Sequence, residues 1–186
     1  MKKVSVALTL FVLLSFSVAA FAEEAPQKVI SLANGVLAAY GNDPIIVGAV
    51  KAQNAKGRTL AEIQKIDKKW RETPGIADFM SALMTSECGQ YIKKIQNSKD
   101  YFAEIFVMDN QGGNVAMTDK TSDFWQGDEA KFKKSFNNGA GAVFIDDVEF
   151  DESAQSYLVQ VSVPVMSGGK AIGAITFGID IDRIQE

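Results

Sequence analysis

Residues 156–181, which read SYLVQVSVPVMSGGKAIGAITFGIDI, decide the fold. On both sides of the pair Gly168–Gly169, apolar residues recur at every second position, which is the period of a β-strand. Segments 156–166 and 170–181 are therefore predicted to be two strands that a tight turn joins into an antiparallel hairpin.

The alternation gives the two sides of this hairpin different chemistry. One side is apolar and carries Val159, Val161, Val163, Val165, Ile175, Phe177 and Ile179. The other side carries small or polar residues, namely Gln160, Ser162, Ala174, Thr176 and Gly178. Solvent can cover such a face of an antiparallel sheet. Its low polarity favours a pocket for a bound molecule instead.

Three more strands and several helices are predicted from the remaining chain. Segments 101–109 and 114–119 flank the turn Asn110–Gly113, and segment 142–150 adds a fifth strand after a short helix at 129–136. Upstream, apolar residues recur at three and four positions, which predicts helices at 29–41, 44–57, 59–72 and 79–95, the last with a possible break at Gly89. Helices before consecutive antiparallel strands indicate the α+β fold class.

The first 22 residues have the form of a secretory signal peptide. Lys2 and Lys3 precede the apolar run 4–18, and Ala20-Phe21-Ala22 has the form of a cleavage site. The run is shorter than the roughly 20 residues of a membrane-spanning helix. We therefore expect cleavage near Ala22 and a periplasmic or secreted protein without membrane insertion, in which 23–99 is a helical segment and 100–186 a sheet domain, together one structural unit.

Composition excludes several kinds of chemistry. The chain has no histidine and one cysteine, so neither a histidine-based catalytic triad nor an intramolecular disulfide can form. Loss of Lys2 and Lys3 with the signal peptide changes the net charge from −4 to −6, which argues against nucleic acid as a partner. The acidic run Asp146–Glu152 lacks the order of residues in a calcium loop, so no metal site is predicted and calcium stays a minor alternative.

Adjacent aromatic residues mark the loop before the short helix, in the stretch TSDFWQGDEAKF at 121–132. Phe124 and Trp125 are predicted to close over the small-residue face and to form walls of a pocket. From spacing alone, Trp125 and Phe132 fit equally well as core residues that plug the edge of the sheet.

From residue 101 to residue 182, the chain resembles the Cache superfamily, the PAS-like extracellular sensor domains also called PDC domains. The similarity lies in the D-x-x-G turn at 109–112, the Pro164-Val165 pair before Gly168-Gly169-Lys170, and the I-G-x-x-x-x-x-I-D ending at 172–180. The resemblance implies a PAS-like, five-stranded antiparallel sheet preceded by an N-terminal helical segment. Because the chain stops at Glu186, it also implies a free-standing, single-Cache module.

The resemblance and the strand parities together give the expected ligand-binding residues. Trp125, Lys131 and Phe132 fall where the family holds a ligand's polar head, and Phe144 and Asp151 fall near positions that meet an amino group. The family's arginine and tyrosine on this segment are absent, so the expected ligand is an organic acid or an amine, with Lys131 as the charge partner of an acid. The full predicted set is Phe106, Met108, Phe124, Trp125, Lys131, Phe132, Phe144, Asp151, Ser162 and Thr176.

The expected function is that of a sensor module without catalytic activity or cofactor, which passes ligand occupancy to a membrane receptor or kinase. An N-terminal helix often supports dimers in this family, so a homodimer is an open expectation. The alternative is a structural or interaction protein of the envelope whose pocket is filled; side chains packed beneath Trp125 would favour it. An enzyme would need two converging carboxylates with shifted pKa values, and no such pair is evident.

Overall fold

The computed structural model describes residues 24–151 and 155–185, so the predicted signal peptide lies outside the described residues. Within these two ranges, no helix is long and apolar enough to cross a membrane. The helical elements before the sheet are α1 (Gln27–Leu32), the π-helical turn η1 (Ala33–Leu37), α2 (Ala38–Tyr40), α3 (Pro44–Asn54), α4 (Leu60–Glu72), α5 (Asp78–Thr85) and α6 (Glu87–Gln96).

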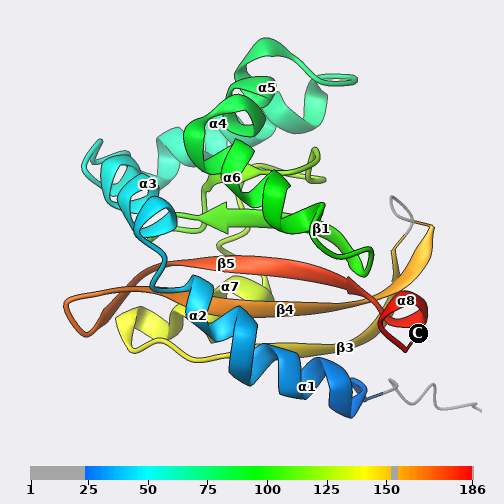
Figure 1. Cartoon of the computed structure of the whole chain (residues 1–186). Helices are drawn as coiled ribbons and strands as arrows, with labels where there is room; N and C mark the ends of the chain where they lie inside the picture. Colours follow the sequence, from blue (N-terminus) through cyan, green and yellow to red (C-terminus); the bar gives the residue numbers. More distant parts are fainter. Residues whose placement is uncertain (1–23, 152–154, 186) are drawn as a thin grey trace, which may run out of the picture.

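Five strands form one antiparallel sheet with the order β2-β1-β5-β4-β3 (Figure 1). The strands are β1 (Phe102–Met108), β2 (Asn114–Met117), β3 (Phe144–Asp151), β4 (Ser156–Ser167) and β5 (Lys170–Asp180). The predicted fold class is confirmed: an α+β fold in which an N-terminal helical segment precedes a five-stranded antiparallel sheet. The chain also forms α7 (Ala130–Phe136), the short turn η2 (Asn137–Gly139) and α8 (Ile181–Gln185).

The apolar side of the β4–β5 hairpin packs against the N-terminal helices. Val161 pairs with Phe177 and Val163 with Ile175, and all four side chains are fully buried. Val29, Ile46 and Ile92, from α1, α3 and α6, belong to the same apolar cluster. The predicted apolar row is therefore one wall of the main core.

Predicted capping signals position the helices that surround this core. The Asp43 carboxylate accepts hydrogen bonds from the backbone N–H groups of Ile45 and Ile46, at the start of α3. Thr59 and Glu62 form the predicted capping box of α4.

The expected helix 79–95 is two helices, and the break lies at Ser86 rather than at Gly89. The Ser86 hydroxyl caps α6 by accepting from the backbone N–H of Gly89. A Cβ at Gly89 would lie 2.2 Å from the Leu83 carbonyl oxygen and 2.4 Å from that of Met84. The glycine therefore marks a close approach between α5 and α6, not the interruption.

Two further predictions need correction. The expected helix 29–41 contains the π-helical turn Ala33–Leu37, and the last strand ends at Asp180, one residue before α8. Asp180 ends it by capping: its carboxylate accepts from the backbone N–H groups of Asp182 and Arg183, which starts the α8 turn.

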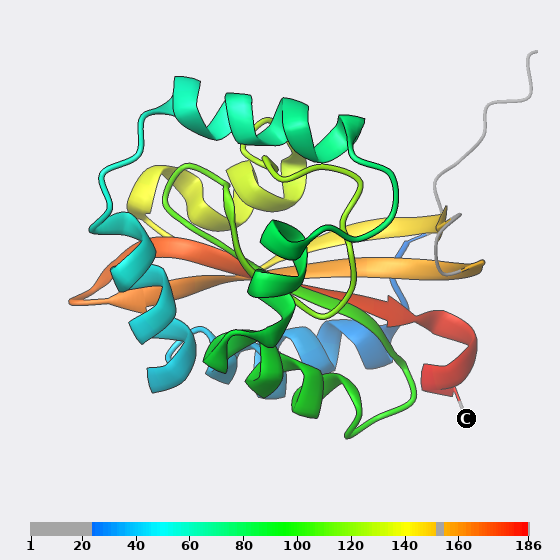
Figure 2. The ribbon, with the colours of Figure 1, turned by 90° about the horizontal axis from the view of Figure 1, so that it is seen from above.

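The opposite face of the sheet is covered by α4, α7 and the loop between β2 and α7. Figure 2 shows these elements on one side of the sheet and α1, α2, α3 and α6 on the other. A second apolar cluster fills much of this side, with Trp70 and Ile63 from α4 and Phe106 and Met108 from β1. The small-residue face of the hairpin is thus covered by protein rather than by solvent.

Gly89→Ala is expected to lower the free energy of unfolding by about 1–3 kcal/mol, because the methyl group has to displace backbone carbonyls. Gly48→Ala in α3 is the matched control, since its added Cβ would meet no described atom within 4 Å. Alanine there is expected to stabilise α3 by about 0.5–1 kcal/mol. Urea unfolding of both variants measures the contrast, and equal effects would disprove the close-approach explanation.

Candidate ligand-binding cavity

A cavity of about 460 Å³ lies between the small-residue face of the sheet and the loop that covers it. Its floor is formed by strand residues and its roof by residues of the β2–α7 loop. The lining residues are Glu104, Phe106, Lys120, Thr121, Ser122, Gln126, Lys131, Asp151 and Gln160. A volume of this size lies within the range of small-molecule sites, about 300–1,000 Å³.

Glu104 places a carboxylate on the floor of the cavity. It stands on β1 opposite Gly178 of β5, where a Cβ would lie 2.7 Å from the Glu104 Cγ atom. The glycine that suggested space for a ligand thus makes room for this side chain. The Glu104 carboxylate accepts a hydrogen bond from Gln160 Nε2 at 3.1 Å.

Burial raises the pKa of Glu104 above its ordinary value, because desolvation disfavours the charged form. The ammonium of Lys131 and the hydrogen bond from Gln160 oppose the rise, whereas the carboxylates of Asp151 and Asp119 add to it. The protein's own groups therefore leave the negative charge of Glu104 incompletely compensated.

The roof loop is fastened to α4 by the buried carboxylate of Asp67. Its Oδ1 atom accepts hydrogen bonds from the backbone N–H groups of Phe124 at 2.9 Å and Trp125 at 3.1 Å. Oδ2 pairs with Arg71 one helical turn later, at 2.7 Å. Because these hydrogen bonds join the loop to α4, we expect the loop and the helix to move together.

Two further hydrogen-bond sets join the same loop to α4 and the segment after it. The indole N–H of Trp70 donates to the Thr121 carbonyl oxygen at 2.9 Å. Lys120 donates to the carbonyl oxygens of Thr73 at 2.9 Å and Gly75 at 2.8 Å. Thr121 and Lys120 both line the cavity, so the connection runs from the cavity wall directly to α4.

Three of the ten predicted site residues line this cavity, namely Phe106, Lys131 and Asp151. The Lys131 ammonium lies 5.6 Å from the Phe106 ring centroid and pairs with Glu129 at 2.9 Å, and its side chain is only 14% exposed. Lys131 therefore already has an anionic partner inside the protein.

The structure places the other strand and helix residues of the predicted set outside the cavity lining. Ser162 and Thr176 are fully buried and hydrogen-bond to each other at 2.7 Å. Met108 and Phe132 belong to the second apolar cluster, where Phe132 stacks on Phe136. Phe144 lies beneath the Lys134 ammonium, 4.4 Å from its ring centroid.

Phe124 and Trp125 also lie outside the cavity lining, which corrects the mechanism predicted for them. Phe124 is 3% exposed and packs against Trp70 with 5.7 Å between ring centroids. Trp125 donates its indole N–H to the Gln111 carbonyl oxygen at 2.8 Å and packs on the second apolar cluster. The loop does cover the sheet, but through Thr121, Ser122 and Gln126, while the two aromatic side chains anchor it.

Sequence reasoning missed Glu104 and the polar roof residues. A signal existed for Glu104, because it alternates with Phe106 and Met108 and therefore belongs to the same face of the sheet. Gln160 was placed on this face by the same parity argument. Thr121, Ser122 and Gln126 carried no comparable signal, since the path of a loop does not follow from periodicity.

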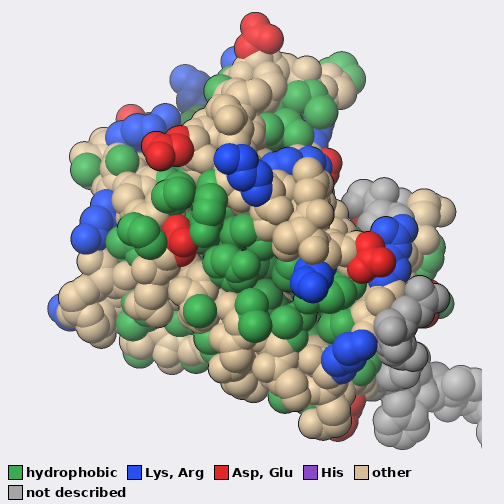
Figure 3. Space-filling view, in the orientation of Figure 1, with side chains coloured by type: hydrophobic (Ala, Val, Ile, Leu, Met, Phe, Trp, Pro, Cys, Tyr) green, Lys and Arg blue, Asp and Glu red, His purple; other side chains and the backbone are tan. Residues whose placement is uncertain are grey.

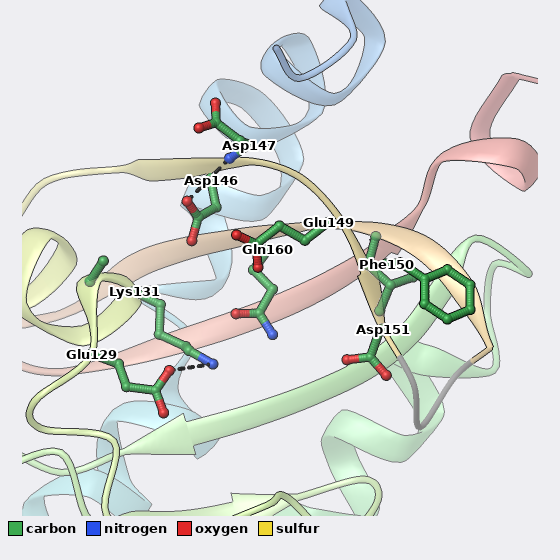
Figure 4. Close-up of a pocket in the computed structure, with 10 residues that line it drawn as sticks. Glu129, Lys131, Asp146, Asp147, Glu149, Phe150, Asp151 and Gln160 are labelled. Carbon is green, nitrogen blue, oxygen red and sulfur yellow. Dashed lines mark hydrogen bonds and ion pairs between the residues drawn. The ribbon is translucent and has the colours of Figure 1, made fainter. Parts of the chain in front are cut away.

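A smaller recess of about 270 Å³ adjoins the cavity and shares Lys131, Asp151 and Gln160 with it. Figure 4 shows the Lys131 side chain directed to Glu129, and the carboxylates of Asp146, Asp147 and Glu149 along β3. Across residues 24–151 and 155–185, no three carboxylates or other ligating side chains converge as they would around a metal ion. The recess is therefore a region of negative potential rather than a formed cation site.

A groove on the other side of the sheet, about 670 Å³, lies between α3 and the α5–α6 pair. Figure 3 shows hydrophobic side chains gathered on this face of the molecule. Small and aliphatic residues such as Ile45, Ala49 and Leu83 line the groove together with Cys88. Burial raises the pKa of the Cys88 thiol to about 12, so it is unreactive at neutral pH.

Asp67→Ala is expected to lower the free energy of unfolding by about 1–3 kcal/mol, because the buried N–H of Phe124 and the partly buried N–H of Trp125 lose their acceptor. Lys68→Ala on the same helix is the control, since its ion pair with Glu72 is exposed on both sides. The control is expected to cost less than about 1 kcal/mol. Chemical denaturation distinguishes the two, and a Lys68→Ala variant as unstable as Asp67→Ala would contradict this assignment.

Glu104→Gln is expected to raise the melting temperature at pH 7, because the amide has no charge to desolvate. Above the ordinary value of 4.5, the native state binds the Glu104 proton more tightly than the unfolded chain does. Wild-type stability therefore falls as the pH rises through the raised pKa, and the advantage of the variant disappears as the pH falls toward 4.5. Melting curves at several pH values, with Glu87→Gln at an exposed site as control, measure the effect; a variant that is less stable at pH 7 would refute it.

Comparisons with known proteins match structures but not sequences. Neither the protein-family models nor the curated proteins give a match to this chain. The sensor domain of the V. cholerae histidine kinase DctB matches 86% of this chain and 55% of its own length, with 13% identity and a TM-score of 0.44.

Two chemoreceptor domains match over a similar extent. The ligand-binding domain of Campylobacter jejuni Tlp3, in complex with 4-methylisoleucine, is 12% identical over 86% of this chain and 61% of that chain, with a TM-score of 0.43. That of the Pseudomonas aeruginosa PAO1 amino acid chemoreceptor PctC, with GABA, is 10% identical over 86% of this chain and 63% of that chain, with a TM-score of 0.41. The chain thus spans between about half and two thirds of these domains.

Proposed function

We propose that this protein is an extracytoplasmic sensor module that binds a small organic acid or amine in the cavity beneath the 120–126 loop. In this proposal the protein passes its occupancy to a partner and catalyses no reaction. The observation that carries the proposal is the cavity itself, in which Glu104, Gln160 and Lys131 meet beneath a hydrogen-bonded roof. The resemblance of residues 101–182 to the Cache superfamily supports the same role.

The connection of the roof to α4 provides a route for the signal. A ligand that contacts Thr121, Ser122 or Gln126 contacts the roof loop. The backbone of this loop is hydrogen-bonded to the side chains of Asp67 and Trp70 on α4. Binding then favours the loop position that closes the cavity, and α4 follows because the two are fastened together. A membrane receptor or kinase that prefers this position would read it.

One observation favours a second candidate, an envelope interaction protein with the same fold. Beneath Phe124 and Trp125, side chains of the second apolar cluster fill the face, which is the packing expected of a filled pocket. The cavity lies beside this filled part, so a ligand screen decides between the two candidates.

The test is a thermal-shift screen of the purified protein against organic acids, amines and amino acids, including L-valine and GABA. A ligand present at a hundredfold excess over its Kd is expected to stabilise the protein by about 2.7 kcal/mol. Ser122→Tyr, which places a ring at the cavity wall, is expected to abolish the shift. Ser31→Tyr, on α1 across the sheet, is expected to preserve it.

Hydrogen exchange provides the second readout for the route through α4. Amide exchange in α4 is expected to slow on binding, whereas exchange in α1 stays unchanged. If no compound of the panel shifts the melting temperature, or if Ser122→Tyr leaves a shift intact, the interaction protein becomes the better interpretation.

A further inference from the structure

The lysines that line the cavity already have partners within the protein. The lining also includes the Glu104 carboxylate on the floor. Lys131 pairs with Glu129, and Lys120 donates to two backbone carbonyl oxygens. An anionic ligand would thus enter a cavity whose cations are already paired.

Gln126 adds a buried acceptor that lacks a donor. Its side-chain amide nitrogen donates to the carbonyl oxygen and the carboxylate of Asp123, which fixes the orientation of the amide group. The residue is 1% exposed and lines the cavity, and its Oε1 atom accepts no hydrogen bond from any described residue. Less than 1 Å² of this atom is accessible, so a ligand in the cavity does not reach it, whereas Glu104 on the floor is only partly buried.

The surroundings of the cavity reinforce its preference for positive charge. The adjoining recess carries Asp146, Asp147 and Glu149 of β3, on the side of the cavity where Lys131 and Asp151 lie. Carboxylates gathered along a concave surface raise the local concentration of cations. The Phe106 ring, which the Lys131 ammonium already approaches, adds an aromatic wall that a cation can contact.

We propose that the ligand of this cavity is a small organic cation whose ammonium group pairs with Glu104. This inference rests on the proposed function and narrows it, since it selects amines and excludes ligands that carry only carboxylates. Glu104 acts as the residue that determines specificity. Occupancy would compensate the charge of Glu104, which otherwise accepts a hydrogen bond from the neutral amide of Gln160.

Three compounds with one four-carbon chain test the proposal by calorimetry: putrescine with two amines, GABA with one amine and one carboxylate, and succinate with two carboxylates. Putrescine is expected to bind at least tenfold more tightly than GABA, and succinate to show no binding. Glu104→Gln, which keeps the shape and removes the charge, is expected to weaken putrescine at least tenfold. Glu87→Gln on α6, across the sheet, is the matched control and is expected to leave the affinity unchanged.

The outcomes separate this inference from the function on which it rests. Tighter binding of succinate than of putrescine, or a cavity ligand whose affinity Glu104→Gln leaves unchanged, overturns the inference while the sensor function stands. The absence of binding by these three compounds and by the whole thermal-shift panel overturns both.

Discussion

The antiparallel pairing of β4 with β5 is the interaction on which the rest of the structure depends. These strands, of 12 and 11 residues, are the longest in the described chain, and their register sets which side chains share a face. A shift of one residue would exchange the two faces and bury polar groups in the main core. With the observed register, valines and isoleucines meet the helices, and small or polar residues meet the roof loop.

The cavity side of the sheet contrasts with the main core in how its polar groups are satisfied. Asp67 is buried but accepts two backbone hydrogen bonds and pairs with Arg71, so its charge supports the fold. Glu104 is less well satisfied, because burial raises its pKa and only partly opposing interactions surround it. Departures from the rule that buried polar groups are paired are expected at functional sites, where a ligand completes the pairing.

The sequence predicted the parts of the fold that depend on local pattern. Strand parities assigned the buried row from Val159 to Val165, and capping residues located the starts of α3 and α4. The candidate site was predicted only in part, because its roof depends on where a loop comes to rest. The ring of Phe124 found a place beside Trp70, 54 positions earlier in the chain, and no local pattern contains that contact. The same alternation places Glu104 on one face with Phe106 and Met108, although the prediction included only these two apolar residues.

The positions of the tryptophans have a consequence for optical work on this protein. The chain contains two tryptophans, Trp70 and Trp125, and each donates its indole N–H to a backbone carbonyl, at Thr121 and Gln111. Trp70 bonds directly to the roof loop, and Trp125 is part of it. Intrinsic tryptophan fluorescence therefore originates from the roof loop and from the helix to which that loop is bonded. The protein thus contains a natural fluorophore pair at the one place where a change of loop position would alter its emission.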